Sequence, residues 1–393
     1  MIEVPANPVP AGLASRVRFA VAGQGDDDSI RCLLRTNPMA GVVQLTFERE
    51  PDCFRSDGMA GASDRTIVAY DQDRLVCMGK TNVRPRFLNG RVARVGYLGE
   101  LRLDISARGR FDILRRGYRF FRELEESSGG ESPELWFTSI VSDNHRSLRF
   151  LERNLPGMPR YTFLSGFVTM LITVPRSLAV AKRRAATIGE RLARNGYQVK
   201  SASVADLPAI SSLLNECGVD AQLAAEWTPN LLGSLREWGL GANDWLCIGN
   251  ESQLVACSAL WDQRGFRQTV IRGYAPPLST ARPLLNLLSP LLGRSPLPPP
   301  DTILAHAFLS PMAMKGDNDS LVADLVELSL ADARRRGLEF LTLGLPSGHA
   351  SLSALRRRFS CREYRSRLYQ VSWTDGAEVR FKNQEFAPEV SLL

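Results

Sequence analysis

The sequence predicts an α/β (α+β) protein of two similar units, each a mixed, mainly antiparallel sheet flanked by helices. Three observations carry this prediction. A chain of 393 residues is longer than one hydrophobic core usually organises. Runs with a two-residue hydrophobic period alternate with helical runs in both halves. The order of these runs in the first half recurs in the second, at an offset of roughly 200 residues.

The composition is typical of a soluble globular protein. Apolar residues make up 44% of the chain and charged residues 23%. The first residues carry an early acid and three prolines, unlike a secretory signal, and the longest apolar runs are too short to cross a bilayer. We therefore expect a cytoplasmic protein without a membrane partner. The seven cysteines have no CxxC spacing and the three histidines no metal-ligand spacing, so we expect reduced thiols and no metal.

The first half, residues 14–175, begins with a strand and a capped helix and continues with antiparallel strands. Asn89-Gly90 marks a tight turn between two alternating runs, and helix and strand alternate after the second of them. The predicted elements are a strand and helix near 17–35, strands 66–70, 75–83 and 91–105, helix 111–126, strand 134–141, helix 144–155 and strand 161–174.

The second half, residues 197–375, repeats this order more weakly. Its predicted elements are strands 245–249, 254–261, 268–274 and 302–309, helix 320–336, strand 338–345, helix 349–359 and strand 364–373. Residues 176–196, which are rich in Ala, Arg and Leu, are predicted to form a basic helical linker. We interpret this linker as a solvated or interdomain-packed helix, with a nucleic-acid contact as the alternative. Residues 376–393 remain as a C-terminal tail.

A basic strand–turn–helix junction stands at the centre of the first half. Leu101 and Leu103 alternate with polar residues as in a half-buried strand, and a helical period follows from residue 111. Residues 101–122 hold seven arginines and two aspartates. A helix start offers unpaired backbone N–H groups and the positive end of the helix dipole. We predict that this turn binds an anion through Arg108 and Arg110; the alternative is that both are solvated turn residues.

This element order, with the strand–turn–helix at its centre, resembles the GNAT acyltransferase superfamily, and tandem GNAT proteins in particular. In that family a strand is followed by Arg/Gln-x-x-Gly-x-Gly/Ala, whose backbone amides hold the pyrophosphate of acyl-CoA. Leu101 and Leu103 match the strand positions and Arg108 the leading basic position. Gly109 and Arg110 fall where small and basic residues are common, and Phe111 and Ile113 stand at the two small positions. The resemblance implies two GNAT-like domains and a substrate that is acetyl-CoA or another acyl-CoA.

A second family element follows the next predicted strand. The family pattern is Asn, a small residue three positions on, and usually a Tyr four further. Asn144 and Ser147 match, and Leu151 stands at the Tyr position. Asn144 is also expected to cap its helix. The cofactor-binding set implied by the resemblance is Leu101, Leu103, Arg108, Gly109, Arg110, Phe111, Asn144 and Ser147.

Glu100 is the candidate catalytic residue. Acyl transfer to an amine needs a deprotonated amine and a polarised carbonyl. A carboxylate on the strand beside the cofactor acts as the base if partial burial raises its pKa. Glu100 precedes Leu101 and, in a regular strand, lies on the face opposite Tyr97 and Leu101. The alternative is an ion pair with Arg102, which shares that face, or with another neighbour.

The second half is predicted to be a degenerate copy. Its corresponding turn has Lys315 and Gly316, but Asp317 and Asp319 beside them repel a diphosphate. The helix start that follows the next strand has no Asn to match Asn144. We therefore expect that this copy has lost cofactor binding and shapes the cleft or an oligomer contact.

Together these observations favour an N-acyltransferase, in the first instance an N-acetyltransferase, that moves an acyl group from acyl-CoA to a small-molecule or peptide amine. We leave a homodimer open and do not expect a nucleic-acid partner. Two alternatives remain. One is a Fem-type transferase that takes an aminoacyl group from tRNA bound by the basic linker. The other is a non-catalytic acyl-CoA-binding or regulatory protein, which Phe111, Ile113 and Leu151 favour.

Overall fold

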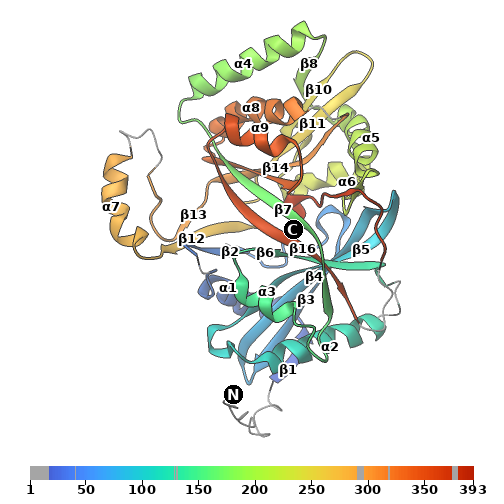
Figure 1. Ribbon diagram of the computed structural model, residues 1–393, viewed down its shortest axis with the longest axis vertical. Helices are drawn as coiled ribbons and strands as arrows, with labels where there is room; N and C mark the ends of the chain where they lie inside the picture. Colours follow the sequence, from blue (N-terminus) through green and yellow to red (C-terminus); the bar gives the residue numbers. More distant parts are fainter. Residues whose placement is uncertain are drawn as a thin grey trace, which may run out of the picture.

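Most strands of both halves belong to one continuous mixed sheet that is flanked by helices (Figure 1). The computed structural model describes residues 17–39, 41–127, 129, 132–289, 296–316, 319–373 and 379–393. Twelve strands form the large sheet in the order β1-β3-β4-β5-β6-β16-β7-β15-β14-β11-β10-β8. The predicted fold class is confirmed.

The first half follows the predicted order and adds a strand, β2, that the sequence pattern did not reveal. Its elements are β1 (Val17–Val21), α1 (Asp27–Thr36), β2 (Val43–Glu48), β3 (Ser63–Asp71), β4 (Arg74–Leu88), β5 (Arg91–Leu103), α2 (Phe111–Ser127), β6 (Leu135–Val141), α3 (His145–Leu151) and β7 (Arg160–Thr173).

The second half begins with α4, which occupies the predicted linker. Its main elements are α4 (Leu178–Arg194), β8 (Gln198–Ser201), α5 (Leu207–Gly218), α6 (Pro229–Ser234), β10 (Trp245–Gly249), β11 (Leu254–Trp261), β12 (Gln268–Tyr274), α7 (Leu278–Leu288), β14 (His306–Met314), α8 (Asp319–Arg335), β15 (Phe340–Pro346), α9 (Ser351–Arg358) and β16 (Cys361–Ser372). The short strands are β9 (Ala221–Gln222), β13 (Thr302–Ile303) and β17 (Glu385–Phe386). β2 pairs with β12, so a small second sheet, β13-β12-β2, also joins the two halves.

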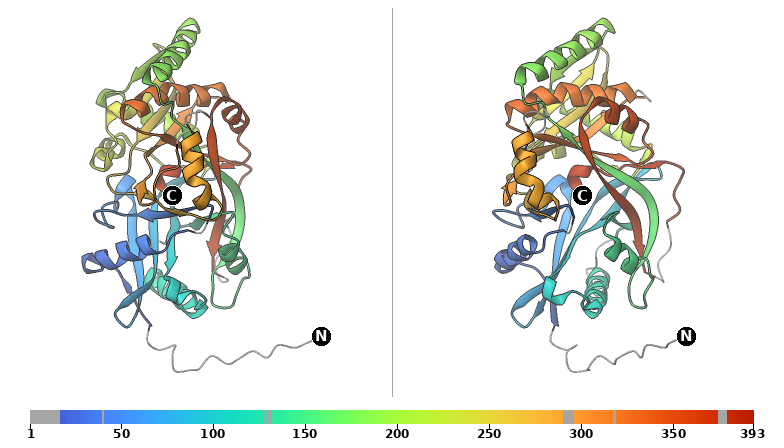
Figure 2. Two further views of the ribbon diagram at one scale, coloured as in Figure 1. Left: turned by 90° about the vertical axis from the view of Figure 1, so that its left-hand side faces the viewer. Right: turned by 60° about the vertical axis from the view of Figure 1, so that its left-hand side comes forward.

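The last strand of each half is exchanged with the other half. β7 pairs with β15 along Phe340–Pro346, and β16 lies between β6 and β7, antiparallel to both. These two long strands run side by side through the middle of the molecule (Figure 2). Val168, Met170 and Ile172 of β7 are buried in one apolar cluster with residues of α8 and β15. The predicted boundary at residue 175 therefore separates segments of the chain whose sheets are interlocked.

The helix α4 packs against α8 over an apolar stripe. Ala181, Ile188 and Leu192 are buried, and Arg191 forms an ion pair with the buried Asp324 of α8.

Within the described residues, no helix is long and apolar enough to cross a membrane.

The segment predicted as a C-terminal tail ends in the interior. In all three views the C-terminus lies near the middle of the molecule (Figures 1 and 2). Ser391 and Leu392 are buried within a short 3₁₀ turn, Val390–Leu392.

Candidate functional site

The two parallel strands at the centre of the first half, β5 and β6, diverge after three residue pairs. β5 and β6 pair only at Val95–Leu135, Gly96–Trp136 and Tyr97–Phe137. One residue further on, the Thr138 hydroxyl donates to the carbonyl oxygen of Leu98 at 2.6 Å. β5 then continues to Leu103 without a strand partner on that side, because β6 pairs instead with β16. An edge of unpaired backbone groups is thereby left beside the junction with α2.

A β-bulge lies where the strands part. The β4–β5 register shifts between Lys80–Gly99 and Met78–Arg102, so that Glu100 and Leu101 stand opposite one residue of β4. Glu100 has a φ of +52°, which is uncommon for a residue with a side chain. The bulge breaks the alternation of faces on which the predicted orientation of Glu100 rests.

Glu100 is an ion-paired carboxylate. Its partner is Arg49, which follows β2 and is 5% exposed. Burial alone would raise the pKa of Glu100, but the positive charges of Arg49, Lys80 and Arg267 lower it to about 2. The condition under which Glu100 would act as a general base, a pKa raised by partial burial, is therefore not met. The alternative of an ion pair holds with a different partner, since Arg102 donates to the carbonyl oxygen of Leu101 at 3.0 Å.

The turn before α2 is less open to an anion than predicted. The Arg110 guanidinium pairs with Asp71 at 2.7 Å and with Asp112 at 3.1 Å, so its charge is already balanced. The backbone N–H groups of Arg108, Arg110, Phe111 and Ile113 donate to carbonyls of the turn itself. Arg108 is exposed, and Gly109, with a φ of +94°, has open space around it. These two positions are the most accessible parts of the turn.

Side chains on α2 and α3 narrow the approach to the parted strands. Phe111, which is 50% exposed, stacks on Phe150 with the ring centres 4.6 Å apart. Ile113 is fully buried under the sheet, and Leu151, an aliphatic residue at the position of the family's Tyr, is buried in the core. Of the predicted strand positions, Leu101 is exposed and Leu103 is half-buried.

Asn144 and Ser147 meet at the start of α3. The Asn144 side chain accepts a hydrogen bond from the Ser147 backbone N–H at 3.2 Å. The predicted helix cap is confirmed. Both residues also lie next to the end of β6, as the resemblance implies for a cofactor contact.

In the second half, the parallel strands β14 and β15 diverge in the same way, but the C-terminal end of the chain fills the gap between them. β14 and β15 pair only from His306–Phe340 to Phe308–Thr342, and the β11–β14 register shifts near Ser310. The Ser310 hydroxyl donates to the Glu389 carboxylate at 3.0 Å and lies 3.0 Å from the Ser391 hydroxyl. On β15, a Cβ added at Gly344 would lie 2.5 Å from the Val390 Cβ. The C-terminal segment, residues 389–393, therefore occupies the place that stays unpaired in the first half.

The residues of the predicted anion-binding turn in the second half are either paired with other side chains or lie outside the described residues. Lys315 forms an ion pair with Glu216 at 2.9 Å. Asp317 and the side chain of Asp319 lie outside the described residues.

The carboxyl group of Glu389, in the C-terminal segment, has a raised pKa. Burial raises the pKa of Glu389 to about 7, although Ser310 and Arg86 oppose the rise.

A pocket of about 450 Å³ lies against the paired strands β7 and β16, between the ends of β6 and β15. It is lined by Phe163 and Phe167, by Gly166 and Val168, by Ser142, Ser347 and Ser366, and by Arg356, Arg365 and Arg367. Arg356 and Arg367 are paired with Glu363 and Glu152, respectively.

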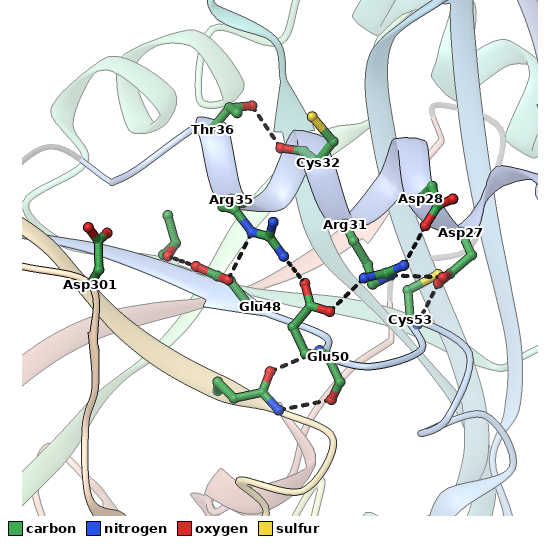
Figure 3. Close-up of polar contacts among 12 residues, drawn as sticks. Asp27, Asp28, Arg31, Cys32, Arg35, Thr36, Glu48, Glu50, Cys53 and Asp301 are labelled. Atoms are coloured by element: carbon green, nitrogen blue, oxygen red, sulfur yellow. Dashed lines mark hydrogen bonds and ion pairs between the residues drawn. The ribbon is translucent and has the colours of Figure 1, made fainter.

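A second pocket, of about 340 Å³, adjoins an ion-pair network between α1, β2 and β12. Figure 3 shows the part of this network in which Arg31 and Arg35 of α1 contact Glu48 and Glu50. Arg31 and Arg35 of α1 both pair with Glu50, and Arg272 of β12 pairs with Glu48. Beside this network, Asp27, Asp52 and Cys53 lie close enough together to hold a metal ion. Asp27 already accepts hydrogen bonds from Arg31 and from the Cys53 backbone N–H.

Sequence reasoning missed Arg49, Arg267 and the C-terminal segment. Arg49 has no local pattern that connects it to Glu100, 51 residues away. The apolar end of the chain, "VSLL", is the one signal that residues 390–393 are buried.

Known structures share this architecture, whereas no family model and no curated protein matches the sequence. A GCN5-related N-acetyltransferase from Sphaerobacter thermophilus superposes over 94% of this chain and 99% of its own, with a TM-score of 0.54 and 11% identity. N-myristoyltransferase from Saccharomyces cerevisiae with bound myristoyl-CoA superposes over 98% of this chain and 92% of its own, with a TM-score of 0.57 and 8% identity. The chain therefore has the fold shared by GCN5-related N-acetyltransferases and N-myristoyltransferases.

Proposed function

We propose that this protein is an acyl-CoA-dependent N-acyltransferase whose acyl-CoA lies between β5 and β6 of the first half. The observation that carries the proposal is the unpaired edge of β5, which runs from the bulge at Glu100 to the start of α2. The second half has the same parting, but residues 389–393 fill it, so the proposal includes one acyl-CoA per chain.

The free edge of β5 suits the amide-containing arm of CoA. That arm has N–H and C=O groups that can pair with an exposed strand, as an added strand does. The diphosphate would then lie toward Arg108 and Gly109, where the turn is most open. Leu101, Leu103, Asn144 and Ser147 flank this path, and the ring of Phe111 must turn aside to let the ligand pass.

At the bulge, the thioester carbonyl would meet backbone N–H groups that are not used in strand pairing. Such donors polarise the carbonyl and stabilise the oxyanion of the tetrahedral intermediate. The amine nitrogen forms the new C–N bond, and the C–S bond then breaks to release the CoA thiolate. The nitrogen becomes positively charged as it attacks, and the ionised Glu100 is placed to stabilise that charge. With a pKa of about 2, Glu100 is a weak proton acceptor, so the proposed role is electrostatic and water takes the proton.

A non-catalytic acyl-CoA-binding protein is the second candidate. The stack of Phe111 on Phe150 and the balanced charge of Arg110 favour it. The tRNA-dependent alternative has less support, because Arg184 and Arg191 of the basic helix point toward Glu327 and Asp324 of α8.

Release of free thiol from acetyl-, octanoyl- and myristoyl-CoA, measured with a panel of amines, tests the proposal. Amine-dependent release that is lost in Glu100→Ala supports an acyltransferase. Saturable acyl-CoA binding without any amine-dependent release supports the binding protein instead.

A further inference from the structure

The pocket of about 450 Å³ on β7 and β16 is lined by charges of one sign. Arg356, Arg365 and Arg367 line it, and within the described part of the chain no acidic residue does. The second pocket has the opposite character, because its three acidic residues outnumber its two arginines. The volume lies in the range of about 300 to 1,000 Å³ that small-molecule sites have. The pocket on β7 and β16 therefore suits a small anion.

Positive charge is concentrated in the two segments that border this pocket. Residues 142–160 run from the end of β6 to the start of β7, and residues 347–367 run from the end of β15 into β16. Together they contain ten arginines and three acidic residues, and all ten arginines are exposed. This excess of seven positive charges equals the formal net charge of the whole chain, +7. The field of these arginines attracts anions toward the pocket.

The two arginines on β16 project from one face of the sheet. Arg365 and Arg367 are two positions apart on a regularly paired stretch, and Arg367 lies opposite Gly166 of β7, so all three positions share that face. A Cβ added at Gly166 would lie 2.6 Å from the Ser347 Oγ, so this hydroxyl stands close over β7 on the same face. In Figures 1 and 2, α9 and α3 lie at the two ends of this stretch of β7 and β16.

Arg365 has no carboxylate of its own. Within the described residues its one ion-pair contact is with Glu363 at 3.9 Å, and its side chain is 71% exposed. Arg356 already holds Glu363 through two hydrogen bonds, of 2.6 and 3.0 Å. Arg367 contacts Glu152 at 3.3 Å. Two carboxylates thus face three guanidinium groups, and an oxyanion can join Arg365 without breaking an existing bidentate pair.

Two hydroxyl groups and an aromatic ring also line the pocket. Ser142 and Ser347 directly follow β6 and β15, and within the described residues their hydroxyls have no hydrogen-bond partner. Phe163 is 55% exposed and lies opposite Tyr369, which meets its ring edge-on with the ring centres 5.9 Å apart. Because Tyr369 follows Arg367 by two positions, the Phe163 ring lies on the arginine face. An exposed ring beside arginines offers a stacking surface for a planar group.

We propose that this pocket binds a small organic phosphate that carries an aromatic ring, in the first instance a nucleoside monophosphate. The phosphate binds Arg365, Arg367 and the Ser347 hydroxyl, and the ring packs against Phe163. Two guanidinium groups and the hydroxyls provide donors for all three terminal oxygens of a phosphate monoester, one more oxygen than a carboxylate has.

The proposed phosphate site is separate from the proposed acyl-CoA site. In the large sheet β6 lies between β5, along which the acyl-CoA is proposed to bind, and β16. Residues of both halves line the pocket, because the exchange of β7 and β16 brings them together. The inference therefore does not depend on acyl transfer.

Calorimetric titration of the full chain with AMP, phenyl phosphate, inorganic phosphate and adenosine, at one ionic strength, tests the inference. We expect AMP and phenyl phosphate to bind at least about tenfold more tightly than inorganic phosphate or adenosine, because only they contact both the arginines and Phe163. Equal affinity for AMP and inorganic phosphate, or no saturable binding of AMP in the millimolar range, would overturn it.

Variants at exposed positions of β16 identify the site without threatening the fold. Arg365→Met is expected to weaken AMP binding by about tenfold or more. Arg362→Met removes an exposed arginine of the same strand that does not line the pocket, and AMP binding should be unchanged. Glu363→Gln should strengthen AMP binding, because it removes the carboxylate that competes for Arg356 and Arg365. Unchanged binding in Arg365→Met, or an equal loss in Arg362→Met, would overturn the inference.

A titration with AMP in the presence of saturating acetyl-CoA separates this site from the proposed acyl-CoA site. We expect the affinity for AMP to be unchanged. Displacement of AMP by acetyl-CoA, together with weaker acetyl-CoA binding in Arg365→Met, would assign the pocket to the nucleotide end of CoA and overturn the inference. Binding of AMP by a chain that transfers no acyl group would support the inference and overturn only the proposed function.

Discussion

Replacing Glu100 by Gln is predicted to destabilise the fold, because the ion pair with Arg49 supports it. The pKa of Glu100 falls from 4.5 to about 2 on folding. At ~1.4 kcal/mol per pH unit, this corresponds to about 3 kcal/mol of stability. Since the folded-state pKa is depressed, that stability is fully present above pH 4.5 and is lost as the pH falls toward 2. Glu100→Gln also leaves Arg49 buried without an anion.

Urea denaturation at pH 7 and at pH 3 measures this contribution. At pH 7 we expect Glu100→Gln to lose about 3 kcal/mol of unfolding free energy, and at pH 3 we expect the difference from wild type to shrink. The double variant Glu100→Gln, Arg49→Met should lose less than the sum of the single losses, because the two residues interact directly. Additive losses, or a change below about 0.5 kcal/mol at pH 7, would refute the assigned pairing.

Three further predictions concern the aromatic stack and the C-terminal segment. Phe111→Ala should strengthen acyl-CoA binding by about threefold or more in a calorimetric titration, because it opens the approach between α2 and α3; weaker binding would show that the ring contacts the ligand. Gly344→Ala should cost about 1 to 3 kcal/mol in thermal unfolding, because its Cβ would meet Val390 and Phe167, whereas the control Gly189→Ala, with open space around it, should cost nothing. Because the folded-state pKa of Glu389 is raised to about 7, its contribution to stability is present below pH 4.5 and is lost as the pH rises through 7. Amide exchange at residues 389–392 should therefore be faster at pH 8.5 than at pH 6, after correction for intrinsic rates, and Glu389→Gln should abolish the difference.

Features with a local physical cause could be predicted from the sequence. The change from strand to helical period gave β5 and α2 to within a few residues, and Asn144 caps α3 as its position before a helix start predicts. The Ala-, Arg- and Leu-rich composition of residues 176–196 predicted a helix in the linker, where α4 lies. In each case the neighbours along the chain determine the structure.

Long-range features could not be predicted in this way. The exchange of β7 and β16 depends on which strand edges meet in space, and a strand's own pattern does not specify its partner. The bulge at Glu100 changes which way that side chain points, although the hydrophobic alternation around it looks regular. The sequence around Arg110 predicts a phosphate contact, because the Asp71 that pairs with Arg110 is 39 residues away and leaves no local pattern. The gap between β14 and β15 is filled by residues 389–393, which lie at the far end of the chain, so the local sequence of these strands does not reveal it.

Amide hydrogen exchange with and without saturating acyl-CoA tests the central claim most directly. If acyl-CoA pairs with the free edge of β5, exchange should slow across residues 98–103 and at the start of α2, and should stay unchanged across residues 309–314 of the filled second half. Protection confined to the second half, or no protection in either half at saturation, would contradict the proposed site.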